Sequence, residues 1–167
     1  MSLHMELLNQ AKHLATREPR RPKQASLRRA VSAAYYALFH LLTFEASGNF
    51  VKAADLSSRI NRTFNHGDMK KVSKHFAGGV VPKAIKGQGT VSVPQLLKNV
   101  AQNFVDLQEA RHEADYNLAK SFTRKEALGI VKVVEQCFVE WNHVRKNDIS
   151  RIYLACFLLW DKWEKER

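Results

Sequence analysis

Side chains that can bind phosphate esters are concentrated in two stretches of the chain, residues 26–45 and 93–118. The first stretch carries Arg28, Arg29, Ser32, Tyr35, Tyr36 and His40, and the second carries Arg111, His112, Asp115 and Tyr116. Because a guanidinium can contact phosphate through two parallel hydrogen bonds, we interpret the combined set as a cationic phosphate pocket. The alternative is a buried Arg111–Asp115 ion pair, bonded to tyrosine hydroxyls, that fixes the register of two helices.

Both stretches have the apolar periodicity of long α-helices, which must bring these side chains together. In residues 26–45, apolar side chains recur at steps of three and four, and Ser26 and Gly48 are the expected helix caps. The same steps run from about Pro94 to Leu118, and Arg111 lies on that apolar seam. A charge on a buried seam costs several kcal/mol unless it is paired, so Arg111 needs a partner within reach.

The rest of the chain is also helical by its pattern. Further helices are expected at residues 5–16, 55–64, 68–76, 123–143 and 149–163, with Ser121 or Thr123 capping the fourth of these. Residues 77–94 hold four Gly and two Pro and are typical of a loop. We therefore predict an all-α fold, an up-down helical bundle of four to five core helices. It forms a single domain of residues 1–167, with a core of about 5–143 and an extra C-terminal helix at 149–164.

Composition restricts the partners that the protein can have. The formal net charge is +11 and the isoelectric point is about 9.9, which favours a polyanionic partner such as nucleic acid.

No apolar run reaches the roughly 18 residues of a transmembrane helix, and the N-terminus lacks the pattern of a signal peptide. Cys137 and Cys156 lie on apolar helical faces, which is typical of buried free thiols. We expect a cytoplasmic protein with no membrane contact.

Sequence motifs for cofactor or metal chemistry are absent. The chain has no CxxC pair, no HExxH and no GxSxG, and its histidines lack metal-ligand spacing. The segment GQGTVS at residues 87–92 has two glycines but lacks the lysine and the preceding strand of a phosphate-binding loop. We therefore expect no cofactor and no metal.

Two segments resemble the HEPN family, the higher-eukaryote and prokaryote nucleotide-binding domains. LRRAVSAAYYALFHLL at residues 27–42 is similar to the first long core helix of that family. ARHEADYN at residues 110–117 is similar to a later helix, in which many bacterial members have an arginine followed by Ala-Asp-Tyr. The resemblance covers about residues 5–141, and the last helix lies outside it.

The resemblance implies a helical bundle that is usually dimeric and, in many members, a metal-independent RNase. The motif of those enzymes is an arginine, then four to six intervening residues, then a histidine. Arg111 matches the arginine, but Tyr116, Asn117 and Leu118 occupy the positions of the histidine, so the motif histidine is missing. Members of this type often occur beside a small nucleotidyltransferase in toxin–antitoxin-like pairs.

Three hypotheses follow from the sequence. The first is a homodimeric protein that binds RNA or a nucleotide, or docks a nucleotidyltransferase. In it Arg111 contacts phosphate and Asp115 orients Arg111. The tyrosines Tyr35, Tyr36 and Tyr116 shape the pocket, and Arg28, Arg29, Ser32 and His40 support it. The second is an RNase with His40 or His112 as the acid or base. The third is a structural dimerisation module without a ligand.

Overall fold

The computed structural model describes residues 1–87, 89 and 91–166. Within these ranges the chain forms helices and no strand, which confirms the all-α prediction. The helices are α1 (Leu3–Thr16), α2 (Gln24–Phe50), α3 (Ala54–Asn61), α4 (His66–Ala77), α5 (Lys83–Lys86), α6 (Gln95–Tyr116), α7 (Arg124–Val144) and α8 (Asp148–Lys165). The rejected loop motif at residues 87–92 lies partly outside the described residues.

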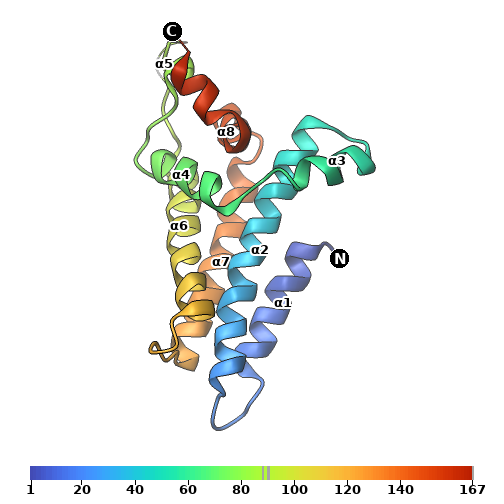
Figure 1. The fold of residues 1–167 in the computed structure, drawn as a ribbon, viewed down its shortest axis with the longest axis vertical. Coiled ribbons are helices and arrows are strands. Elements are labelled where there is room, and N and C mark those ends of the chain that lie inside the picture. The colour runs from blue at the N-terminus through green and yellow to red at the C-terminus, as the bar shows by residue number, and fades with distance from the viewer. Residues whose placement is uncertain (88, 90, 167) are drawn as a thin grey trace. The chain divides into compact units, whose positions relative to one another are not determined.

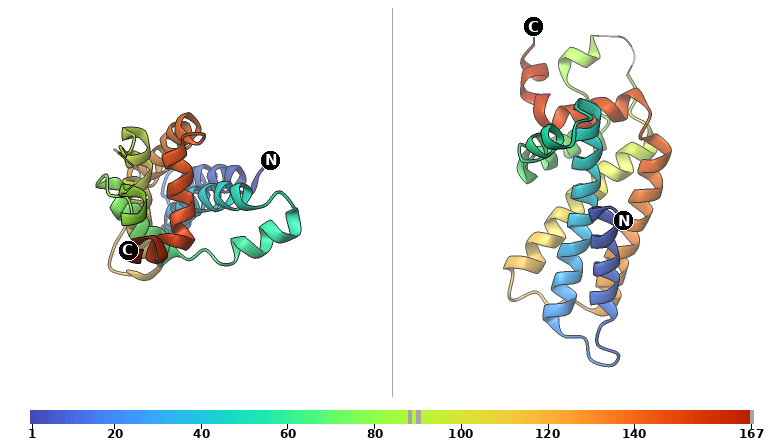
Figure 2. Two further views of the ribbon diagram at one scale, coloured as in Figure 1. Left: turned by 90° about the horizontal axis from the view of Figure 1, so that it is seen from above. Right: turned by 90° about the vertical axis from the view of Figure 1, so that its right-hand side faces the viewer.

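The chain divides into two compact units. Unit 1 comprises residues 1–41 and 103–139, and unit 2 comprises residues 42–102 and 140–167. In unit 1, α1 and the adjoining parts of α2, α6 and α7 run side by side with alternating directions (Figures 1 and 2). Unit 1 is therefore an up-down helical bundle, as predicted.

The core of unit 1 is built from small and branched side chains of all four of its helical segments. One buried cluster consists of Ala15, Leu27, Ala30, Val31, Ala114, Phe122 and Ala127. The alanines let the helices approach closely, while Leu27 and Val31 are fully buried and contribute about 1.5–3 kcal/mol each. This packing brings α2 against the C-terminal end of α6, where the site residues lie.

Unit 2 has an aromatic core to which α8 contributes much of the volume. Tyr153 of α8 is fully buried, and its hydroxyl shares a 2.7 Å hydrogen bond with Ser73 of α4. The indole of Trp160 stacks on the His75 ring with a centroid distance of 4.3 Å. Asn147 separates α8 from α7, because its side chain accepts the Ile149 N–H at 2.9 Å and caps α8.

Several helix ends differ from the sequence prediction. Neither Ser26 nor Gly48 is a cap, because α2 runs from Gln24 to Phe50. Instead of capping α2, the Ser26 hydroxyl donates to Glu18 Oε1 at 2.7 Å, and this bond is the main reason that the pKa of Glu18 is lowered. The short helix α5 lies in the predicted loop.

The predicted start of α7 is confirmed at Thr123. Its Oγ1 accepts the Glu126 N–H at 3.1 Å, and Glu126 Oε2 accepts the Thr123 N–H at 2.8 Å. This reciprocal pair is a capping box. Accepting the Thr123 N–H is also the main reason that the pKa of Glu126 is lowered. Within the described ranges, every helix is too short or too polar to span a bilayer.

Candidate functional site

Arg111 lies against two consecutive tyrosines of α2. Its guanidinium carbon is 5.4 Å from the centre of the Tyr35 ring and 5.7 Å from that of Tyr36. The Arg111 side chain is 12% exposed, and its Nη1 is 3.5 Å from Asp115 Oδ2. The cation–π contacts and the ion pair together stabilise this mostly buried charge. The expected pairing of Arg111 with Asp115 is thus present in the structure.

Asp115 connects α6 to α2. Besides pairing with Arg111, its Oδ2 lies 3.5 Å from the Ser32 hydroxyl of α2, which donates to it. Ser32 is buried, whereas the Asp115 side chain is 21% exposed. The carboxylate therefore neutralises Arg111 and holds Ser32 while keeping one edge in solvent.

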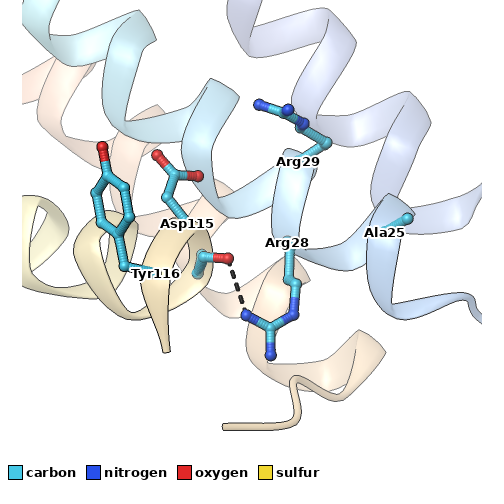
Figure 3. A pocket seen from close by; sticks show the side chains of 6 residues that line it. Ala25, Arg28, Arg29, Asp115 and Tyr116 are labelled. Carbon is cyan, nitrogen blue, oxygen red and sulfur yellow. Dashed lines mark hydrogen bonds between the residues drawn. The ribbon is translucent and has the colours of Figure 1, made fainter. Parts of the chain in front are cut away.

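A pocket of about 410 Å³ opens beside this pair, and we call it the α2–α6 pocket (Figure 3). It is lined by Ala25, Arg28, Arg29, Ala114, Asp115 and Tyr116. Two of its side chains point to solvent: Arg29 is exposed, and Tyr116 is 66% exposed. The pocket thus combines an accessible guanidinium with an accessible aromatic ring.

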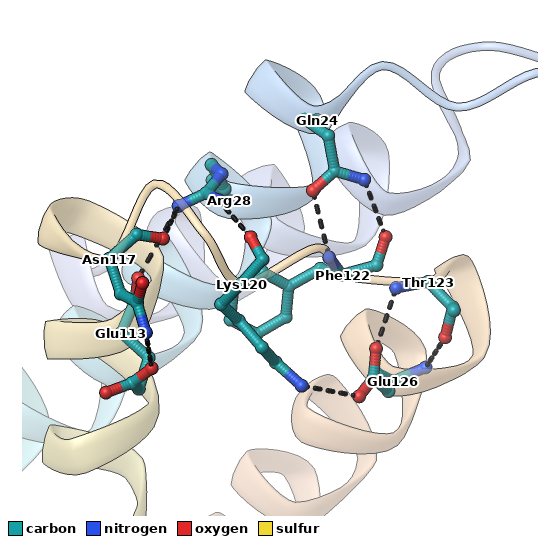
Figure 4. A network of polar contacts seen from close by, with 8 residues as sticks. All are labelled: Gln24, Arg28, Glu113, Asn117, Lys120, Phe122, Thr123 and Glu126. Atoms are coloured by element: carbon teal, nitrogen blue, oxygen red, sulfur yellow. Dashed lines mark hydrogen bonds and ion pairs between the residues drawn. The ribbon is translucent and has the colours of Figure 1, made fainter.

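Arg28 has a structural role at the C-terminus of α6 (Figure 4). Its Nη1 donates to the carbonyl oxygens of Ala114 at 2.9 Å and Asn117 at 3.0 Å, and its Nη2 donates to that of Lys120. Ala114 lies in the last turn of α6, whereas Asn117 and Lys120 follow the helix, so their carbonyls lack the usual intrahelical donor. A cation is favourable at that end of a helix. Because its donors are used in this way, Arg28 has little capacity left for a ligand.

The loop after α6 is held against the start of α2 by a second polar contact (Figure 4). The Gln24 amide donates to the Phe122 carbonyl at 2.7 Å and accepts the Phe122 N–H at 2.9 Å. The Phe122 ring in turn lies 5.8 Å from the Arg28 guanidinium. These contacts tie the loop after α6 to the first turns of α2, which carry Ala25 and Arg28 of the pocket lining.

A second pocket, of about 380 Å³, lies between α1 and α2, and we call it the α1–α2 pocket. Its lining residues are Leu7, Gln10, Leu14, Arg29, Ser32, Ala33 and Tyr36. Arg29 lines both pockets. Within the part of the chain that the structure describes, the Arg29 guanidinium makes no hydrogen bond or ion pair, so its charge is directed to solvent.

Comparison of the chain with protein-family models, with curated proteins and with solved structures found no match.

The two candidate histidines have different surroundings. His112 is exposed, and its ring lies 5.0 Å from that of Tyr116, beside the α2–α6 pocket. His40 is half-buried near Phe39 and Tyr36, with ring-centroid distances of 5.3 and 6.2 Å. Burial, and to a smaller degree the charge of His4, lowers the pKa of His40. His112 is consequently the histidine that adjoins the pocket.

The candidate residues thus occupy distinct positions in unit 1. The structure brings Arg28, Arg29, Asp115 and Tyr116 to one pocket, whereas Tyr35 is fully buried in the core. No cluster of three metal-ligating side chains occurs among the described residues.

Sequence reasoning missed the contribution of α1. Gln10 lies three residues after Leu7 and four before Leu14, so these side chains share one helical face. This spacing could have indicated from the sequence that Gln10 lies beside Leu7 and Leu14 at the α1–α2 pocket.

Proposed function

We propose that the chain is a HEPN-like protein that binds RNA or a nucleotide at the α2–α6 pocket. The observation that carries this proposal is the juxtaposition of the exposed Arg29 guanidinium and the exposed Tyr116 ring around one cavity. A guanidinium binds phosphate oxygens, and an exposed aromatic ring stacks on a base. The net charge of +11 adds long-range attraction for a polyanion.

Within this proposal Arg29 contacts the phosphate and Arg111 acts as a positioning residue. Arg111 is 12% exposed and is paired with Asp115, so it braces the carboxylate and the tyrosines behind the pocket. Arg28 holds the end of α6 in place. This division refines the assignment from sequence, in which Arg111 itself held the phosphate.

The same resemblance leads us to propose a homodimer that acts beside a small nucleotidyltransferase in the cytoplasm. Light scattering of the purified chain tests the dimer. Co-purification of the chain with a nucleotidyltransferase encoded beside it tests the partnership. A monomer at all concentrations would refute the dimer without affecting the pocket.

Binding is tested with a fluorescent single-stranded RNA of mixed sequence, measured by anisotropy. We expect Arg29→Ala and Tyr116→Ala each to weaken binding about tenfold, since one charged hydrogen bond or one stacked base contributes 1–3 kcal/mol. The matched control is Arg151→Ala, which removes the same charge from the exposed face of α8. Equal losses for Arg29→Ala and Arg151→Ala would show non-specific attraction, and absence of binding would favour a structural module.

A metal-independent RNase is the second candidate function, because His112 contacts a ring that lines the pocket. In that case a ribose 2′-hydroxyl attacks the adjacent phosphate and the bond to the 5′-oxygen of the next nucleotide breaks, which gives a 2′,3′-cyclic phosphate. The imidazole either removes the proton of the 2′-hydroxyl or protonates the leaving 5′-oxygen. The test is cleavage of mixed-sequence RNA in EDTA by the wild type, with Arg111→Ala and His112→Ala in parallel. Intact RNA in the presence of folded wild-type protein would exclude this function.

A further inference from the structure

Arg29 stands between two cavities of similar size. The α2–α6 pocket has a volume of about 410 Å³ and the α1–α2 pocket about 380 Å³, and Arg29 lines both. Each volume falls within the range of small-molecule sites. An exposed guanidinium shared by two such cavities can hold an anionic group that joins two ligand moieties.

Besides Arg29, a hydrogen bond also links the linings of the two cavities. Ser32, which lines the α1–α2 pocket, donates to Asp115, which lines the α2–α6 pocket, over 3.5 Å. The Asp115 carboxylate is paired with Arg111, so the Arg111 guanidinium neutralises its negative charge. The wall between the pockets therefore presents hydrogen-bonding groups and the positive charge of Arg29.

The two cavities suit a ligand that has two similar ends. Each contains one tyrosine, Tyr116 in the α2–α6 pocket and Tyr36 in the α1–α2 pocket. The Tyr36 ring is supported by the Arg111 guanidinium at 5.7 Å, and apolar side chains of α1 complete its pocket. Gln10 adds an amide, which can pair with the edge of a base.

We propose that the ligand is a dinucleoside phosphate unit, with one nucleoside in each pocket and the bridging phosphate on Arg29. This inference rests on the proposed function and extends it from one nucleotide to two. A mononucleotide occupies the α2–α6 pocket of the proposed function and leaves the α1–α2 pocket open. Two nucleosides joined by phosphate engage both tyrosines and the shared guanidinium at once.

Calorimetry of the full chain with three probes tests this inference. The probes are AMP, the 3′,5′-linked dinucleoside monophosphate ApA, and diadenosine diphosphate. We expect a dinucleotide to bind at least about tenfold more tightly than AMP, because a second base is stacked. Tighter binding of ApA identifies an RNA strand as the source of the unit, and tighter binding of diadenosine diphosphate identifies a pyrophosphate-bridged dinucleotide.

Filling the α1–α2 pocket provides the decisive variant. Gln10→Trp changes an exposed residue of α1, so the fold should be kept, and Ala33→Leu fills the same pocket from α2. Either change should remove the tenfold advantage of the dinucleotide and leave AMP binding within about twofold of the wild type. Asn142→Trp, at an exposed position of α7, is the matched control and should change neither affinity.

The possible failures are distinguishable. If AMP binds and both dinucleotides bind no tighter, the two-pocket inference is overturned while the proposed function stands. If the advantage persists in folded Gln10→Trp and Ala33→Leu, the second nucleoside lies elsewhere and the inference is again overturned. If none of the probes binds, the nucleotide site itself is wrong.

Discussion

Arg28 and Arg29 are neighbours on α2, yet their surroundings predict opposite consequences when each is replaced by alanine. The Arg28 guanidinium donates to the carbonyl oxygens of Ala114, Asn117 and Lys120 in and after the last turn of α6, and more weakly to that of Glu113 over 3.5 Å. Arg29 is exposed and makes no such contacts within the described residues. Arg28→Ala should therefore reduce stability, and Arg29→Ala should reduce binding alone.

The magnitude follows from the hydrogen bonds lost. Bonds from a charged donor contribute about 1.5–3 kcal/mol each, but these carbonyls are partly exposed and regain water in the variant. Allowing about 1 kcal/mol for each bond, Arg28→Ala should lower the free energy of unfolding by about 3 kcal/mol. For a chain of 167 residues this lowers the melting temperature by about 6–12 °C. Arg29→Ala should stay within about 0.5 kcal/mol of the wild type.

Urea denaturation followed by circular dichroism measures these differences, and RNA anisotropy on the same samples measures binding. Arg28→Lys keeps the charge but lacks the planar fork, so it should recover only part of the stability. The assignment of Arg28 as a cap would be refuted if Arg28→Ala unfolded within 0.5 kcal/mol of the wild type. An equal loss of stability in Arg29→Ala would contradict the contrast between the two arginines.

Three further outcomes are expected. Cys137 and Cys156 are buried, and burial raises the pKa of Cys156 to about 12. Neither thiol should therefore react with a disulfide reagent at pH 8 until the protein is unfolded in urea, and rapid labelling of the native protein would contradict their burial. Since burial and the charge of His4 lower the pKa of His40, the unfolded chain binds more protons at this position, and stability should fall as the pH drops below about 6.5. Urea titrations at pH 7 and pH 5 should show a smaller fall for His40→Asn, and an unchanged fall would exclude this histidine as the cause. Arg111→Ala leaves the Asp115 carboxylate without its cationic partner and should lower the free energy of unfolding, measured by urea denaturation, by about 2 kcal/mol. An unchanged free energy would show that the ion pair does not contribute to stability.

Local sequence signals determined most of the helices. In α2 and α6, apolar residues recur at steps of three and four. With 3.6 residues per turn these residues share one face of the helix, so the pattern can be recognised without knowledge of the packing partners. The capping box of Thr123 and Glu126 is likewise local, since both hydrogen bonds span three residues. The caps proposed at Ser26 and Gly48 failed, because tertiary packing extends α2 beyond the residues with the strongest local pattern.

Only the tertiary structure separated the roles of the candidate residues. Arg28 and Arg29 are adjacent and chemically identical, and 100° of helical rotation sends one to the carbonyls of α6 and the other to solvent. Tyr35 and Tyr36 divide in the same way between the core and the α1–α2 pocket. The periodicity of one helix identifies its faces, but the neighbour that each face meets depends on contacts between residues far apart in the sequence.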